Sequence, residues 1–155
     1  RFDTESVAEQ IEVPTLLLHG SEDTLVPPAM SEALGGGRIE SVDYSSAATS
    51  RRQQVADACD VRVHHGDAAA VVGELERPPG LVVLDPPRAG AGAEVVRAIA
   101  LAAPERIIHV GCDPATFARD LAGFGEHGYA VKQMKLIDAF PNTHHFEVIA
   151  VLEAV

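Results

Sequence analysis

Short apolar runs alternate with helix-forming stretches along most of this sequence, and this alternation restricts the possible folds more than any other feature. Each of the first five runs is followed by a stretch with the spacing of an amphipathic helix, such as "AEVVRAIALAA". The five runs are "TLLLHG" (15–20), "RIESVDYS" (38–45), "VRVHHGD" (61–67), "LVVLDPP" (81–87) and "RIIHVGC" (106–112). Repeated units of strand and helix predict a mostly parallel sheet with helices on both faces.

The last two apolar runs break this pattern. "AVKQMKLIDAF" (130–140) and "HFEVIAVLEAV" (145–155) have no helix between them, so they are expected to pair antiparallel at one end of the sheet. The sequence therefore predicts an α/β fold, a Rossmann-like, doubly wound sheet of about seven strands. A chain of 155 residues is expected to form one domain, with "GGG" at 35–37 marking a seam between residues 1–34 and 35–155.

The acidic composition limits the partners that this domain can bind by itself. The formal net charge is −11 and the pI is near 4.9, whereas nucleic-acid affinity comes largely from Lys and Arg that neutralise phosphates. A catalytic domain that relies on another domain for its nucleic-acid contacts stays compatible with this charge. The longest apolar runs are far shorter than the ~20 residues of a membrane span. The two cysteines make no disulfide framework, and no signal-peptide pattern follows Arg1, so we expect a cytoplasmic fragment or processed form.

Aspartates follow three successive predicted strands. Asp43, Asp67 and Asp85 each stand at the carboxyl end of an apolar run. Ligands of doubly wound sheets gather at this edge, so the three carboxylates are expected to accept hydroxyls and amines of a nucleoside-like cofactor. For any one of them, a turn or cap residue is the competing interpretation.

Cys112 lies between an apolar run and the start of a predicted helix. Asp113 is a suitable N-cap residue and Pro114 a suitable first helical residue, so the helix is expected over "PATFARDLAGF". The unpaired N–H groups of a helix N-terminus favour a thiolate, whereas the charge of Asp113 disfavours it. Cys112 is thus a candidate nucleophile, with a small buried residue that closes a strand as the alternative. Cys59 is interpreted as structural.

A second candidate cluster lies in "FPNTHHFEV" (140–148). Side chains alternate along a strand, so Thr143, His145 and Glu147 are expected on one face, where the carboxylate of Glu147 could serve as a base. A solvated strand edge is the alternative. We predict no metal site, because no second ligand stands at metal spacing from His145.

Three of these motifs together resemble the S-adenosylmethionine-dependent RNA uracil-C5 methyltransferases, which make 5-methyluridine in transfer and ribosomal RNA. The motifs are "LVVLDPPRAGAG", "HVGCDPATFARDL" and "FPNTHHFEVIAVLE", and the resemblance covers residues 36–155. It implies Cys112 as the nucleophile that adds to uracil C6, with Glu147 as the base that removes the C5 proton. It also implies that Asp43, Asp67 and Asp85 contact S-adenosyl-L-methionine, and that RNA is the substrate. Asp113 stands where the family has Asn.

Residues 1–34 depart from the family pattern. The family's Gly-rich turn after the first strand is absent, and "LLLHGSEDTLVPP" stands there instead. This segment resembles a late strand and loop of an α/β-hydrolase, in which Asp23 matches the acid of a Ser-His-Asp triad. The G-x-S-x-G motif of that fold is missing, which argues against hydrolase chemistry. A methyltransferase domain and a catalytically silent hybrid of two Rossmann-like pieces both stay open.

Overall fold

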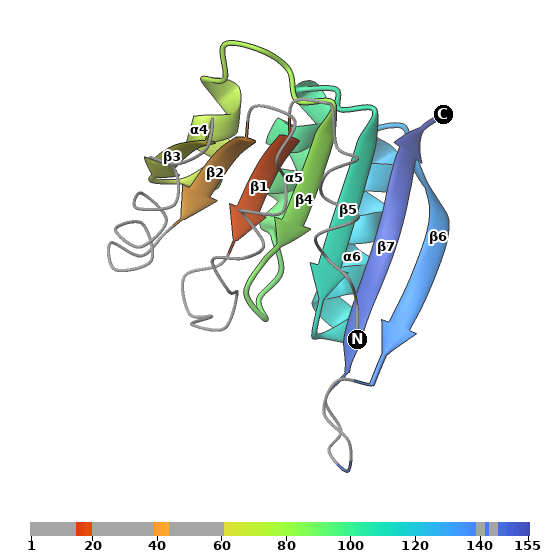
Figure 1. Cartoon of the computed structure of the whole chain (residues 1–155). Coiled ribbons are helices and arrows are strands. Elements are labelled where there is room, and N and C mark those ends of the chain that lie inside the picture. The colour runs from red at the N-terminus through yellow and green to blue at the C-terminus, as the bar shows by residue number, and fades with distance from the viewer. Residues whose placement is uncertain (1–14, 20–38, 44–60, 139–141, 143–145) are drawn as a thin grey trace.

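The computed structural model describes residues 15–19, 39–43, 61–138, 142 and 146–155 (Figure 1). Seven strands form a single sheet in the order β3-β2-β1-β4-β5-β7-β6. The strands are β1 Thr15–His19, β2 Ile39–Asp43, β3 Val61–His65, β4 Leu81–Asp85, β5 Arg106–Gly111, β6 Tyr129–Ile137 and β7 Glu147–Ala154. The described helices are α4 Ala68–Gly73, α5 Gly92–Leu101 and α6 Pro114–Glu126.

The direction of each strand agrees with the alternation in the sequence. Strands β1 to β5 pair in parallel, and β7 runs antiparallel between β5 and β6. Strand β1, from the segment "TLLLH", lies in the middle of the parallel part, between β2 and β4. The seven apolar runs thus become the seven strands, and the last two pair antiparallel as expected.

The described helices cover one face of this sheet. In Figure 1, α5 and α6 lie behind the strands, and α4 packs against α5. The helices predicted between β1 and β2 and between β2 and β3, including "SSAATSRRQQVADAC", lie outside the described residues, as does the "GGG" seam. Helical cover of the second face therefore stays a prediction.

Helix α6 begins as the sequence predicts. Asp113 is its N-cap, and one carboxylate oxygen accepts hydrogen bonds from the backbone N–H groups of Ala115 and Thr116 at 3.1 and 3.0 Å. Pro114 takes the first helical position, where its missing N–H has no cost. Phe117 and Phe124 on the inner face of α6 are buried in the core beside β5.

The core is continuous across the sheet and the helix layer. Its fully buried side chains include Leu16 of β1, Val82 of β4, Ile107 of β5 and Leu152 of β7, with Ile99 of α5 above them. Among the described residues, no helix is both long enough and apolar enough to cross a membrane. The carboxyl ends of the parallel strands are thereby fixed along one edge, where the candidate site lies.

Candidate active site

Cys112 and Glu147 are neighbours at the end of the β5–β7 ladder. Gly111 is paired with Val148 in the antiparallel register, so the next pair outward joins the residue after Gly111 to the residue before Val148. These residues are Cys112 and Glu147. The charge of Glu147 also acts on the thiol of Cys112. The two residues that the sequence singled out for nucleophile and base therefore lie side by side.

The acidity of the Cys112 thiol reflects competing neighbours. Burial and the charge of Glu147 raise its pKa, while the charge and a hydrogen bond of Arg88 lower it. The net effect is a pKa above the ordinary value of 9.0. The favourable effect expected from the helix N-terminus is therefore outweighed, and the resting group at neutral pH is a thiol.

Arg88 closes the "DPPR" motif at the end of β4, and its side chain acts on the thiol of Cys112. Besides its effect on Cys112, its charge helps to lower the pKa of Asp113, a shift caused mainly by the Thr116 amide that Asp113 caps. The Asp113 carboxylate itself is used as the N-cap of α6.

The predicted cofactor residues occupy two kinds of position. Asp43 ends β2 and Asp85 ends β4, and both are in register with His19 of β1, so they stand at the same edge of the sheet on either side of the central strand. Asp67, by contrast, is the N-cap of α4 and accepts a hydrogen bond of 3.0 Å from the Ala70 N–H. Asp67 thus has the capping role that was its competing interpretation, while Asp43 and Asp85 stand at the edge expected for a ligand.

Some of the predicted residues are not described. Thr143 and His145 lie outside the described residues, as do Asp23 and Cys59, so the shared face of Thr143, His145 and Glu147 stays a prediction. Within the part of the chain that the structure describes, no group of three His, Cys, Asp or Glu side chains is placed to hold a metal ion.

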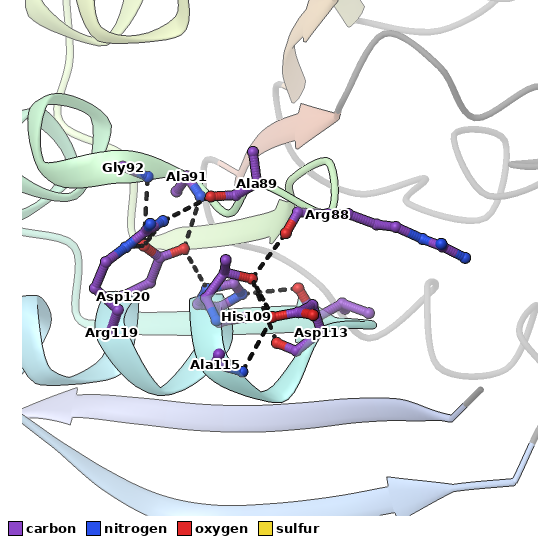
Figure 2. Close-up of polar contacts among 11 residues, drawn as sticks. Arg88, Ala89, Ala91, Gly92, His109, Asp113, Ala115, Arg119 and Asp120 are labelled. Atoms are coloured by element: carbon purple, nitrogen blue, oxygen red, sulfur yellow. Dashed lines mark hydrogen bonds and ion pairs between the residues drawn. The ribbon is translucent and has the colours of Figure 1, made fainter. Parts of the chain in front are cut away.

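The sequence interpretation missed a buried polar cluster beneath the site. His109 of β5 is fully buried and Asp120 of α6 is 2% exposed, with 3.4 Å between His109 Nε2 and Asp120 Oδ2. Figure 2 shows Asp120 and Arg119 reaching from α6 to the segment that follows β4. A signal was present, because Asp120 shares the helix face of Phe117 and Phe124 at a spacing of three and four residues. A carboxylate on the apolar face of a helix indicates a buried partner.

A hollow of about 750 Å³ lies elsewhere, between α4 and α5. It is lined by apolar residues such as Val72, Leu75 and Ala98, together with Glu94 and Arg97. None of the candidate site residues contributes to it, so it has no part in the site around Cys112.

Comparison with known proteins finds one family profile that matches the part of the chain carrying the site motifs. Residues 79–155 match the sequence profile of the tRNA (uracil-5-)-methyltransferases. An uncharacterised RNA methyltransferase of Corynebacterium efficiens is 42% identical over 127 residues, which are 82% of this chain and 30% of that protein. A counterpart in Corynebacterium diphtheriae is 40% identical over 139 residues, 87% of this chain and 33% of that protein. The chain thus spans about a third of the length of these relatives.

Solved structures agree on the fold. The tRNA (uracil-54, C5)-methyltransferase of Pyrococcus abyssi, in complex with S-adenosyl-L-homocysteine, superimposes with a TM-score of 0.73 at 23% identity. The superposition covers 96% of this chain and 36% of that one. The fold is therefore that of the class I methyltransferases.

The expected hydrolase-like character of residues 1–34 finds no support. The alignment with the C. diphtheriae protein covers 87% of this chain, more than residues 36–155 alone provide, so it includes part of the N-terminal segment. The likeness to a hydrolase strand has a simple physical reason. A short apolar run that ends in a polar loop is what both folds need for a central parallel strand, so "TLLLHG" suits either.

Proposed function

We propose that this chain is part of the catalytic domain of an enzyme that forms 5-methyluridine in RNA, because residues 79–155 match the profile of the tRNA (uracil-5-)-methyltransferases. The observation that carries the proposal is the adjacency of Cys112 and Glu147 at the end of the β5–β7 ladder. A thiol and a carboxylate at neighbouring register positions can reach two atoms of a single pyrimidine ring.

The proposed reaction begins at the sulfur of Cys112. The thiol passes its proton to solvent water as the sulfur adds to uracil C6, which places electron density on C5. Arg88 supports this step, because its charge favours the thiolate. When bound, S-adenosyl-L-methionine supplies the methyl group to C5. Glu147 then removes the C5 proton, the C6–sulfur bond breaks, and the thiolate of Cys112 is released.

Two aspartates at the ends of neighbouring parallel strands fit a nucleoside-like cofactor. Asp43 and Asp85 flank the end of β1, at the edge where α/β sheets bind ligands. Their carboxylates are acceptors for ribose hydroxyls and for amines. In this proposal Asp43 and Asp85 hold S-adenosyl-L-methionine, and Asp67 contributes mainly by capping α4.

RNA, either tRNA or rRNA, is the proposed substrate. With a net charge of −11, this chain can neutralise few RNA phosphates. RNA binding is therefore assigned to other parts of the longer protein. The relatives that it matches are about three times as long.

Calorimetric titration of the chain with S-adenosyl-L-methionine tests the cofactor part of the proposal. We expect a dissociation constant on the order of micromolar, weakened about tenfold by Asp85→Asn, which corresponds to roughly 1.4 kcal/mol. Glu105→Gln is a control with the same change of charge, because Glu105 is exposed just before β5, at the opposite end of the parallel strands. Equal weakening by both variants would contradict the assigned cofactor edge.

A second candidate is a catalytically silent domain of the same fold. It is favoured by one observation, the absence of the family's Gly-rich turn after "TLLLH". The same titration separates the two candidates, since a silent domain shows no heat of binding at millimolar cofactor, whereas the methyltransferase does.

A further inference from the structure

The segment that carries Arg88 is a tight loop between β4 and α5. Gly90 N–H donates to the Pro87 carbonyl at 2.7 Å, and both Gly90 and Gly92 have φ of +81°. A Cβ atom at Gly90 would lie 2.4 Å from Arg119 Nη2 and 2.7 Å from Asp120 Oδ2. The loop therefore approaches α6 more closely than any residue with a side chain would allow.

Three side chains of α6 hold the backbone of this loop (Figure 2). Thr116 Oγ1 donates to the Arg88 carbonyl at 2.9 Å, and Arg119 Nη2 donates to the Ala89 carbonyl at 2.7 Å. Asp120 accepts from the next two amides, Ala91 N–H at 2.6 Å and Gly92 N–H at 3.3 Å. Because these three side chains lie at positions i, i+3 and i+4, one face of the helix binds the loop from Arg88 to Gly92.

Asp120 is the centre of this arrangement. It is 2% exposed, and a buried carboxylate is costly unless its oxygens are satisfied by donors. Besides the two loop amides it contacts Arg119 at 3.1 Å and His109 at 3.4 Å, and His109 is itself held by the Val110 carbonyl at 2.8 Å. The cluster is thus tied to β5 as well as to α6.

The same two elements carry the proposed nucleophile. Cys112 follows β5 and precedes α6 by two residues, while Arg88 stands at the start of the loop that Asp120 holds. We propose that Asp120, with Thr116 and Arg119, is a positioning residue that keeps Arg88 beside Cys112. This inference rests on the proposed function for the role of Cys112, but the contact between loop and helix does not depend on it.

Two charged groups act on Cys112 from different elements. Arg88 approaches from the loop after β4 and Glu147 from β7, while Asp113, the next residue along the chain, is engaged as the N-cap of α6. Of these, only Arg88 favours the thiolate. Loosening the loop moves that cation away and leaves the carboxylate of Glu147, so the thiol becomes a weaker acid.

The test is the pH dependence of alkylation of Cys112 by iodoacetamide, followed by mass spectrometry of the Cys112 peptide so that Cys59 does not contribute. Asp120→Asn is expected to move the midpoint to higher pH and to slow alkylation below the midpoint by up to about tenfold, since one pKa unit is a tenfold change in thiolate. Arg88→Gln is expected to produce the same shift. In the double variant, Asp120→Asn should add nothing.

Tyr129→Phe is the matched control. It also removes a buried hydrogen bond, the one of 2.8 Å from the Tyr129 hydroxyl to the Pro104 carbonyl, but at the other end of α6. It should leave the midpoint unchanged. If Asp120→Asn fails to fold, Thr116→Val is the second variant, because it removes the bond to the Arg88 carbonyl, together with two bonds of Thr116 to its own helix cap Asp113, and should shift the midpoint in the same direction.

An unchanged midpoint in a folded Asp120→Asn protein, or a shift that adds in full to that of Arg88→Gln, would overturn the proposal. Alkylation needs neither RNA nor S-adenosyl-L-methionine, so this result is separable from the proposed function. If the two variants shift the midpoint without adding and no methyl transfer occurs, the positioning role of Asp120 is supported and the proposed function is contradicted. If methyl transfer occurs but the midpoint does not move, the proposed function is supported and the positioning role is contradicted.

Discussion

The Cys112 thiol lies between a carboxylate that opposes its ionisation and a guanidinium that favours it. Burial and Glu147 dominate, so the pKa of the thiol is raised despite Arg88. In the proposed reaction, a protonated resting sulfur suits a nucleophile that reacts only when a substrate ring is in place.

Glu147→Gln tests this balance. Removing the negative charge takes away an influence that raises the pKa of Cys112, so the midpoint of alkylation against pH should move down, opposite to the shift expected for Arg88→Gln. Iodoacetamide kinetics across pH would measure both variants. A midpoint that rises or stays fixed in Glu147→Gln would show that the two side chains do not interact.

Gly111, the residue before Cys112, is constrained by packing. A Cβ atom there would lie 2.4 Å from Cδ2 of the buried Phe117 ring. Gly111→Ala is therefore expected to lower the free energy of unfolding by about 1–3 kcal/mol, the usual cost of overpacking a core. Gly125→Ala in α6 is the control, because a Cβ there meets nothing within 4 Å and should stabilise the helix by roughly 0.5–1 kcal/mol. Urea unfolding of both variants would measure these changes. A Gly111→Ala protein as stable as the wild type would contradict the close packing of Gly111 against Phe117.

Among the elements, the strands and the start of α6 could be predicted, whereas the contacts between elements could not. The apolar run at 106–112 forms β5 at Arg106–Gly111, because a short apolar run directly before a capped helix is typical of a buried parallel strand. The adjacency of Cys112 and Glu147 depends on the register of β5 against β7, which no local pattern specifies. The role of Asp120 depends on which backbone amides face α6, and that is decided by packing.

The contact between α6 and the loop should make stability depend on pH in acid. Burial raises the pKa of Asp120, but hydrogen bonds from His109, the Ala91 amide and Arg119 more than offset this, so its pKa is below the ordinary 3.8. A carboxylate with a lowered pKa in the folded state contributes stability above its unfolded pKa, and this contribution is lost as the pH falls through the folded value.

We therefore expect the wild-type free energy of unfolding to fall more steeply below pH 3.8 than that of Asp120→Asn. Urea unfolding at several pH values would measure the difference, and the variant should already be less stable at neutral pH. Parallel curves for the two proteins would contradict the assigned charge of Asp120.

The molecule as a whole combines a methyltransferase fold with an acidic composition. Strand β1 takes the central place in the sheet although its sequence resembles a strand of another α/β fold, which shows how little a short apolar run says about ancestry. Under the proposed function, the net charge of −11 assigns the RNA contacts to other parts of a longer protein, while Cys112 and Glu147 lie at one edge of this sheet.

The most direct measurement of the central claim is covalent trapping on RNA that contains 5-fluorouridine, in the presence of S-adenosyl-L-methionine. Fluorine at C5 leaves no proton for Glu147 to remove, so elimination stalls and the adduct persists on a denaturing gel. The account predicts an adduct that maps to the Cys112 peptide, is lost in Cys112→Ala and still forms in Glu147→Gln. An adduct that persists in Cys112→Ala, or methylation of ordinary uridine RNA by that variant, would contradict it.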